Sequence, residues 1–279
     1  MKLKQLFRRA PNLSPEQLKK FRDEHQEGGY TLLDVRQPGE YEKRHLAGAK
    51  LVPLAELPGR LDELNPQEPV VAYCAVGGRS RAAAQMLQGQ GFKEVYNLEG
   101  GIKAWDGLTA QGTPDWGLEI MDPGESPALV LAAAYSLERG LAACYQGLAQ
   151  ATDHQELSEL YQRLAGFEDR HMDRLKRAWE GLAPEERQGA ELEAQGNAPF
   201  MEGGWKVEEF LAQHTDAAQG QAEVLMLAMG LETQAMDLYL RLAQRMDQSK
   251  SRALLEELGQ EEKSHLQALG EMLERLQNG

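Results

Sequence analysis

The sequence predicts two domains, an N-terminal α/β domain with an open parallel sheet and a C-terminal all-α four-helix bundle. Short runs rich in Val and Leu alternate with helical stretches in the first part, whereas long stretches rich in Ala, Leu, Glu and Arg follow Pro127. The charge changes near the same place. Residues 1–110 hold 16 Lys and Arg against 14 Asp and Glu, while residues 111–279 hold 14 against 30. A chain of 279 residues is long enough to give each domain its own core.

The N-terminal domain is predicted to span residues 1–107. Compact apolar runs, typical of buried parallel strands, occur at residues 30–35, 51–52, 70–73 and 95–98. Helical stretches lie between and around them, at residues 15–25, 41–45, 57–64 and 79–87, with Ser14 as the N-cap of the first. This alternation of strand and helix predicts a parallel sheet with helices on both faces.

The stretch from Gly107 to Pro127 contains four Gly and three Pro without periodicity, so residues 108–126 are predicted to be a linker. The bundle is predicted to span residues 127–279. Its long helices are expected at residues 128–149, 155–179, 217–246 and 250–276. The connection at residues 181–219 is too long for a tight helical hairpin. It predicts one long crossover that contains a short helix at residues 207–213.

The bundle sequence contains an internal duplication. Three residues recur 94 positions later with their spacing intact, so that Glu138, Glu168 and His171 return as Glu232, Glu262 and His265. The flanking positions recur as well, since Leu137, Tyr145, Leu148 and Ala149 return as Leu231, Tyr239, Leu242 and Ala243. The duplicated unit is a pair of helices, and the residues that it retains are predicted to bind metal.

A Glu from each of two helices and a Glu-x-x-His from each of the other two build a two-metal carboxylate site in four-helix bundles. The Glu-x-x-His spacing places both side chains on one face of a helix. Glu168 and Glu262 are expected to bridge the two ions, and carboxylate and imidazole ligands suit iron or manganese. The alternative is a plain bundle with these residues as surface charges, which does not explain why the duplicate kept all six. A single further Glu-x-x-His, at Glu42 and His45, is interpreted as structural.

On these residues, the chain over 126–276 resembles the rubrerythrin branch of the ferritin-like di-iron proteins. The resemblance implies two iron ions per chain, with manganese as the other option, and reduction of peroxide or dioxygen. Rubrerythrins usually carry another Glu one turn after the third-helix ligand, where this chain has Ala235, with Leu141 at the duplicated position. The paired Cys-x-x-Cys motifs of a rubredoxin module are also missing, so an external electron donor is expected. The alternative hypothesis is an iron-binding or redox-sensing bundle.

A reactive-cysteine loop follows the predicted strand at residues 70–73. It consists of Cys74, Ala75, Val76, Gly77, Gly78, Arg79 and Ser80. The carboxyl end of a parallel strand is where open α/β sheets place their sites. The glycines and the following helix N-terminus can point several N–H groups at one spot, which forms an anion cradle and favours the thiolate of Cys74. Arg79 adds a planar cation suited to an oxyanion.

This loop makes the first half resemble a rhodanese, a single-domain sulfurtransferase, over residues 12–108. The similarity extends through the segments 33–36, 40–42, 45–49 and 97–101 and through Trp105. The resemblance implies that Cys74 forms a persulfide with a sulfane sulfur from a small anion such as thiosulfate and passes it to a thiol acceptor. It also implies that Asp34 and Arg36 fix the geometry near the loop. The alternative is a sulfur carrier or docking module.

The composition limits the remaining functions. The only cysteines are Cys74 and Cys144, which suits a reducing compartment, and the sequence lacks an apolar run of membrane-spanning length and a signal peptide. A cytoplasmic protein is therefore expected. The acidic second half disfavours nucleic acid as a partner. Cys144 is predicted to point away from the metal ligands as a packing residue, and a homodimer through a helical face is expected. The leading hypothesis is a sulfurtransferase fused to a di-iron oxidoreductase.

Overall fold

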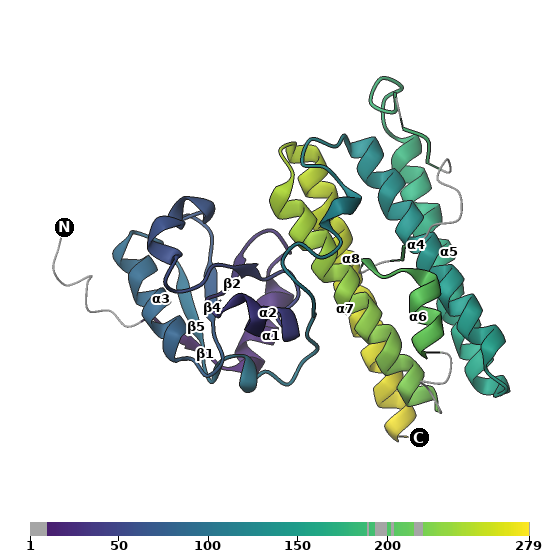
Figure 1. Cartoon of the computed structure of the whole chain (residues 1–279), viewed down its shortest axis with the longest axis horizontal. Coiled ribbons are helices and arrows are strands. Elements are labelled where there is room, and N and C mark those ends of the chain that lie inside the picture. The colour runs from purple at the N-terminus through teal and green to yellow at the C-terminus, as the bar shows by residue number, and fades with distance from the viewer. Residues whose placement is uncertain (1–9, 189, 193–199, 202–203, 215–219, 279) are drawn as a thin grey trace. The chain divides into compact units, whose positions relative to one another are not determined.

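The computed structural model describes residues 10–188, 190–192, 200–201, 204–214 and 220–278. The chain divides into two compact units, Met1–Asp115 and Trp116–Gly279. In Figure 1 the first unit contains the sheet and the second contains the long helices. The predicted combination of an α/β domain with a helical bundle is therefore confirmed.

The first unit is built on a five-stranded parallel sheet in the order β1-β5-β4-β2-β3. The strands are β1 Asn12–Leu13, β2 Thr31–Asp34, β3 Lys50–Leu51, β4 Val70–Tyr73 and β5 Val95–Leu98. Strand β1 was not predicted, because two residues are too few to show the alternation of a strand. The central strand β4 is buried at every residue, as a strand covered on both faces requires.

Helices cover both faces of this sheet. They are α1 Pro15–Glu24, α2 Pro38–Lys43 and α3 Gly78–Gly89. Alternate residues of β4 join separate cores, one with Leu87 of α3 and the other with Leu18 of α1. The predicted cap of α1 is confirmed, because the Ser14 side chain accepts a hydrogen bond from the Gln17 N–H.

The prediction of an α-helix at residues 57–64 is wrong. The structure instead has two short 3-10 turns, η2 Leu57–Gly59 and η3 Leu61–Glu63. Pro58 lacks an N–H group and Gly59 is a poor helix former, so a continuous α-helix is not favoured there. Helix α2 also begins earlier than predicted, because Pro38 occupies its first turn and Gln37 forms a capping box with Glu40.

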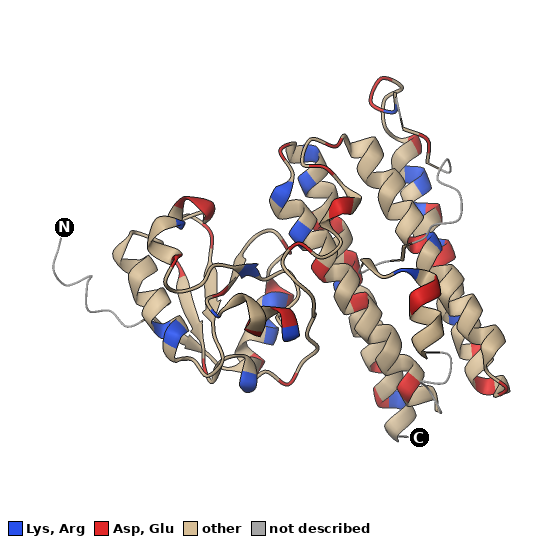
Figure 2. Cartoon of the chain, viewed as in Figure 1, with Lys and Arg blue, Asp and Glu red and all other residues tan. Residues whose placement is uncertain are grey.

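The second unit is a bundle of four long helices. They are α4 Pro127–Ala151, α5 Gln155–Glu180, α7 Gln221–Arg245 and α8 Ser249–Asn278. Helix α4 packs along α5 and α7 packs along α8, and the two pairs are joined by contacts of α4 with α8 and of α5 with α7. The first residues of the predicted third helix, 217–219, lie outside the described residues. Figure 2 shows the acidic residues distributed along these helices.

The crossover between the helix pairs contains the predicted short helix, α6 Val207–His214, which packs on α4. Gly140 allows the crossover to approach α4 closely, because a Cβ atom there would overlap the carbonyl oxygen of Phe200. Gly147 does the same for Leu211 of α6. Small residues on α4 therefore set where the crossover lies.

Both ends of the segment predicted as a linker pack onto the unit beside them. Ala110 pairs with the backbone of His45. Further along, the 3-10 turn η5 Leu118–Ile120 buries Leu118 among core residues of the bundle, and Arg241 donates a hydrogen bond to the carbonyl oxygen of Trp116 at 2.8 Å. The stretch contains apolar residues as well as Gly and Pro, and burial of these apolar residues explains why it packs on the units.

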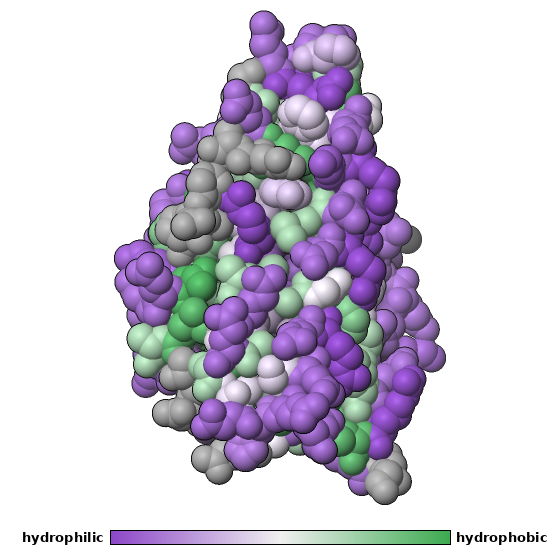
Figure 3. All heavy atoms as spheres, turned by 90° about the vertical axis from the view of Figure 1, so that its right-hand side faces the viewer, coloured by the Kyte–Doolittle hydropathy of each residue, from purple (hydrophilic) through white to green (hydrophobic). Residues whose placement is uncertain are grey.

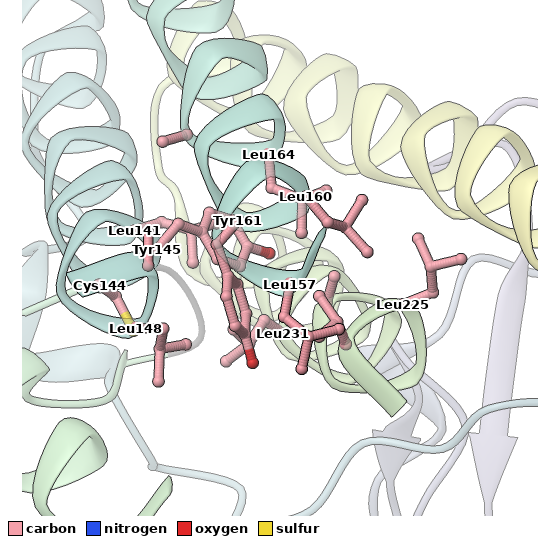
Figure 4. Close-up of a cluster of buried hydrophobic side chains, with 14 of the residues drawn as sticks. Leu141, Cys144, Tyr145, Leu148, Leu157, Leu160, Tyr161, Leu164, Leu225 and Leu231 are labelled. Carbon is pink, nitrogen blue, oxygen red and sulfur yellow. The ribbon is translucent and has the colours of Figure 1, made fainter. Parts of the chain in front are cut away.

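One core of the bundle contains Cys144 (Figure 4). It is fully buried with Tyr145 and Leu148 of α4 and with Leu160 and Tyr161 of α5. Burial raises the pKa of the Cys144 thiol to about 12, so the thiolate is a minor species at neutral pH. The predicted packing role of this cysteine is confirmed.

The outer surface of the bundle is mostly hydrophilic on the face shown in Figure 3, where apolar residues gather only in small groups among the described residues. None of the helices in the described ranges is both long enough and apolar enough to cross a membrane.

Candidate functional site

The Cys74 loop connects β4 to α3 and is shaped by glycine. Gly77 has φ of +92° and precedes the first residue of α3. Its N–H group donates a hydrogen bond to the sulfur of Cys74 at 3.1 Å, and a Cβ atom there would crowd the backbone nitrogen of Gly100 at 3.3 Å. The positive φ thus turns a backbone donor toward the sulfur.

The sulfur environment favours the thiolate. Burial by itself raises the pKa of Cys74, but hydrogen bonds from the Ser80 side chain and from the N–H groups of Ser80, Val76 and Gly77 together lower it below its ordinary value. The Ser80 hydroxyl lies 3.4 Å from the Cys74 sulfur and 2.7 Å from the Asn97 side-chain oxygen. This is the chemistry of a nucleophilic sulfur at a helix N-terminus.

A second glycine, Gly101, lies against the backbone of the Cys74 loop. Gly101 has φ of +60°, and a Cβ atom there would overlap the carbonyl group of Cys74. The neighbouring N–H groups of Ile102 and Lys103 donate to the carbonyl oxygens of Cys74 and Ala75, at 2.8 and 3.1 Å. No role was predicted for Gly101. Its position in a Gly-Gly pair after β5 nevertheless indicates a turn.

Arg79 is paired with Glu40 of α2. The two terminal nitrogens of Arg79 each donate to one carboxylate oxygen of Glu40 at 2.7 Å, which is a bidentate ion pair. Glu40 was not among the predicted site residues. Glu40 and Arg79 are 39 positions apart in the sequence, so local sequence patterns do not predict their contact. Val76, at the tip of the loop, is 62% exposed.

Asp34 and Arg36 form a buried ion pair at the end of β2. Arg36 Nε lies 2.9 and 3.0 Å from the two carboxylate oxygens of Asp34, and its Nη2 donates to the Arg44 carbonyl oxygen at 2.7 Å. These contacts join the end of β2 to the segment after α2, as expected of residues that fix local geometry. The His45 ring stacks on Tyr41 with a centroid distance of 3.6 Å, which agrees with its structural interpretation.

The duplicated residues of the bundle form two matching groups. In the first, His171 Nδ1 lies 2.9 Å from Glu168 and 3.4 Å from Glu138. In the second, His265 Nδ1 lies 3.0 Å from Glu262 and 3.4 Å from Glu232. Within each group, one donor atom from every residue lies within 4.8 Å of the others, so each group could hold a metal ion.

The two groups face each other. The rings of His171 and His265 are stacked with their centroids 3.9 Å apart and their planes at 4°. All four carboxylates are at least 96% buried. The structure therefore brings all six predicted ligands to one place, from helices whose sequences are 94 residues apart.

Comparison with known proteins agrees with both halves. Residues 130–273, more than half of the chain, match the rubrerythrin family, and residues 14–108 match the rhodanese-like domain family. The chain belongs to the rubrerythrin family and carries a rhodanese-like domain. The predicted fusion is confirmed.

Curated relatives match the rhodanese-like domain. The uncharacterized protein YqhL of Bacillus subtilis is 46% identical over 76 residues, which are 27% of this chain and 60% of YqhL. The thiosulfate sulfurtransferase GlpE of Coxiella burnetii is 35% identical over 100 residues, 36% of this chain and 88% of GlpE. A putative sulfur carrier protein of B. subtilis, YrkF, is 42% identical over 78 residues, 28% of this chain. The chain spans 60% of YqhL and 42% of YrkF.

Solved structures match the same domain. A rhodanese-like domain protein from Staphylococcus aureus is 28% identical with a TM-score of 0.34, covering 37% of this chain and 99% of its own. A rhodanese-related protein from Thermoplasma volcanium is 29% identical with a TM-score of 0.31, covering 34% of this chain and 89% of its own.

The donor set of the rubrerythrin domain fits a pair of metal ions. Four carboxylates and two imidazoles converge, and burial together with the nearby Glu232 charge raises the pKa of Glu168. Glu232 Oε2 is buried and lies 3.4 Å from His265 Nδ1. Buried carboxylates in this number are costly unless cations neutralise them.

The position of the extra glutamate in other rubrerythrins is apolar here. Ala235 and Leu141 are both fully buried in the bundle, so neither position supplies a seventh ligand. Tyr145 and Tyr239 are likewise fully buried, one on each duplicated helix. The candidate ligand set is therefore symmetric, with three residues from each half of the duplication.

Proposed function

We propose that the rhodanese-like domain is a sulfurtransferase in which Cys74 carries sulfur as a persulfide. The observation that supports this most is the position of the Cys74 sulfur, which accepts a hydrogen bond from the N–H group of Gly77 at the start of α3. The similarity to the thiosulfate sulfurtransferase GlpE supports the same activity. Loop residues Ala75, Val76, Gly77 and Gly78 would surround the donor, and Arg79 would supply positive charge.

The sulfur-transfer step follows from a thiolate nucleophile. The Cys74 thiolate attacks the outer sulfur of thiosulfate, so a sulfur–sulfur bond forms on Cys74 while the sulfur–sulfur bond of thiosulfate breaks. The electron pair of the broken bond leaves with sulfite. An acceptor thiolate then attacks the outer sulfur of the persulfide and returns Cys74 to its thiolate. N–H groups at the helix N-terminus stabilise the negative charge at each stage.

Substitution of Cys74 tests this activity. Cys74→Ser should abolish thiosulfate turnover and the gain of one sulfur atom by the intact protein, as measured by mass spectrometry. Cys144→Ser is the matched control, because Cys144 is fully buried with a high pKa and should leave turnover unchanged. Full turnover by the Cys74→Ser protein would refute the proposal.

We further propose that the rubrerythrin domain binds two metal ions, iron by preference and manganese as the other option. Glu138, Glu168 and His171 would hold one ion and Glu232, Glu262 and His265 the other. When bound, two ferrous ions would supply the two electrons that reduce peroxide to water, or dioxygen to peroxide, and an external donor would restore them. The protein residues hold the ions and exclude bulk water, since all four carboxylates are buried.

Metal analysis of protein purified without oxygen tests this centre. About two irons per chain, with oxidation of both on addition of peroxide and repeated turnover with a reductant, is the expected result. Two bound irons without turnover would favour the alternative, an iron-binding or redox-sensing bundle. No bound iron or manganese would refute the metal centre. Sedimentation of the same sample tests the proposed homodimer.

A further inference from the structure

The contact between Glu40 and Arg79 bears on which sulfur donors reach Cys74. Both terminal nitrogens of the guanidinium are occupied by the carboxylate, at 2.7 Å each. The same guanidinium is in electrostatic contact with Cys74. An anionic donor that uses Arg79 must therefore displace Glu40 or share the guanidinium with it.

Glu40 is held in this position by its own helix. Its Oε2 accepts a hydrogen bond from the Gln37 N–H at 3.2 Å, as part of the capping box of α2. The hydrogen bonds from Arg79 hold the pKa of Glu40 at about 2, so this carboxylate is ionised throughout the neutral range. The side chains of Arg79 and Glu40 are 37% and 38% exposed, so solvent screens the pair only in part.

Glu40 therefore cancels the positive charge of Arg79 beside the reacting sulfur before a donor arrives. The Cys74 thiolate and Glu40 each contribute one negative charge, and Arg79 contributes one positive charge. The N–H groups and the α3 N-terminus add only partial positive charge. The exposed side chains of Lys103 and Arg44 add cations that water screens, and Arg36, whose charge also acts on Glu40, is paired with Asp34. Thiosulfate brings two more negative charges, whereas a thiosulfonate brings one and has an organic group in place of an oxygen.

The tip of the loop suits an organic group. Val76 lies two residues from Cys74 and is 62% exposed, so it offers an aliphatic surface on the loop that carries the buried Cys74. Apolar contact with this surface favours a donor that has a carbon substituent over an inorganic one.

We propose that Glu40 determines donor specificity, so that Cys74 favours sulfane-sulfur monoanions carried on an organic group, such as thiosulfonates and alkyl persulfides, over thiosulfate. This inference rests on the proposed sulfurtransferase activity and names its substrate class. With a thiosulfonate, the Cys74 thiolate attacks the terminal sulfur and a persulfide bond forms. The bond from that sulfur to the sulfonyl group breaks, and its electron pair leaves with the sulfinate. Thiosulfate reacts by the same step and releases sulfite.

The experiment compares thiosulfate with methanethiosulfonate, using cyanide as the acceptor for both. The wild-type protein should have the higher kcat/KM with methanethiosulfonate. Glu40→Gln should raise kcat/KM about tenfold for thiosulfate and about threefold for methanethiosulfonate, because the removed repulsion scales with donor charge. Added salt should reduce the gain. Gln can still accept the hydrogen bond from Gln37, and a thermal melt checks that the variant is folded.

Glu42→Gln is the matched control. Glu42 lies on the same helix, is exposed, and carries the same charge, so its substitution should leave the ratio of the two donors unchanged. The inference is overturned if Glu40→Gln leaves that ratio unchanged, lowers both values in parallel, or acts no differently from Glu42→Gln. Failure of the underlying activity is a separate result, in which the wild-type protein forms no Cys74 persulfide with either donor.

Discussion

His171 and His265 stack ring on ring, with a centroid distance of 3.9 Å and an angle of 4° between their planes. Each histidine lies beside the second glutamate of its own half of the duplication, at 2.9 Å for Glu168 and 3.0 Å for Glu262. The near-identity of these distances means that the two half-sites are geometrically equivalent. The duplicated helix pair therefore gives two candidate metal positions with similar distances.

Neutralising one buried carboxylate should stabilise the metal-free protein while weakening metal binding. Glu168→Gln replaces the one of the four converging carboxylates whose pKa is raised by burial, and it preserves the shape of the side chain. We expect the free energy of unfolding of the chelator-treated protein to rise by about 1 kcal/mol, because less charge is left buried and uncompensated. Metal content should fall below that of the wild type. Urea denaturation and metal analysis of the same preparation measure both effects.

Glu271→Gln provides the control for this substitution. Glu271 is exposed on α8 and pairs with Arg275 at 3.0 Å, so its loss should change the free energy of unfolding by less than about 0.5 kcal/mol. Loss of stability in metal-free Glu168→Gln would contradict the view that burial of this carboxylate destabilises the metal-free site.

Sulfur transfer should depend on pH through the Cys74 thiolate. Because hydrogen bonds lower the pKa of Cys74, the rate at limiting thiosulfate should rise with pH to a plateau whose midpoint lies below the ordinary cysteine value. Ser80→Ala removes the side-chain hydrogen bond, so the midpoint should move to higher pH while the plateau remains. A rate profile from pH 5 to 10, or thiolate absorbance over the same range, measures the shift. An unchanged midpoint would show that Ser80 does not stabilise the thiolate.

Elements with a clear apolar pattern were predictable from the sequence, whereas the two-residue strand β1 and the turns at residues 57–64 were not. The four long helices carry enough residues for their apolar pattern to be clear, and the structure places α4 and α5 within a few residues of the predicted bounds. Strand β1 has two residues and is defined by its pairing with β5, which only the folded chain shows. The turns at residues 57–64 resemble a helix in composition, but Pro58 prevents one.

The candidate metal ligands were predictable because the duplication repeats them, whereas contacts between unrelated positions were not. Arg174 and Glu261 lie 2.6 Å apart, one turn from His171 and from His265. The duplicated positions are Ala268 and Phe167, so this pair has no counterpart in the other half. The pair of Glu40 with Arg79 is of the same kind. Side chains that meet only because the chain folds have no fixed spacing in the sequence, so such pairs cannot be predicted from a sequence pattern.

The Cys74 loop should tolerate no side chain at Gly101. In Gly101→Ala the new Cβ atom would overlap the Cys74 carbonyl group, and the residue would also keep a positive φ. We expect loss of sulfurtransferase activity and a fall of about 2 kcal/mol or more in the free energy of unfolding. Gly89→Ala is the control, because Gly89 ends α3 with open space around its Cβ position. Equal activity in the two variants would show that the loop does not depend on Gly101.

The two cysteines should differ sharply in reactivity toward an alkylating reagent. Both cysteines are buried, but hydrogen bonds lower the pKa of Cys74, and Val76 two residues further along its loop is exposed, whereas burial raises the pKa of Cys144 to about 12 within the core of the bundle. Iodoacetamide at neutral pH should therefore label Cys74 in the native protein, and Cys144 only after denaturation. Peptide mass spectrometry at successive times gives both rates. Equal labelling of the two thiols in the native protein would mean that the core around Cys144 opens as readily as the loop.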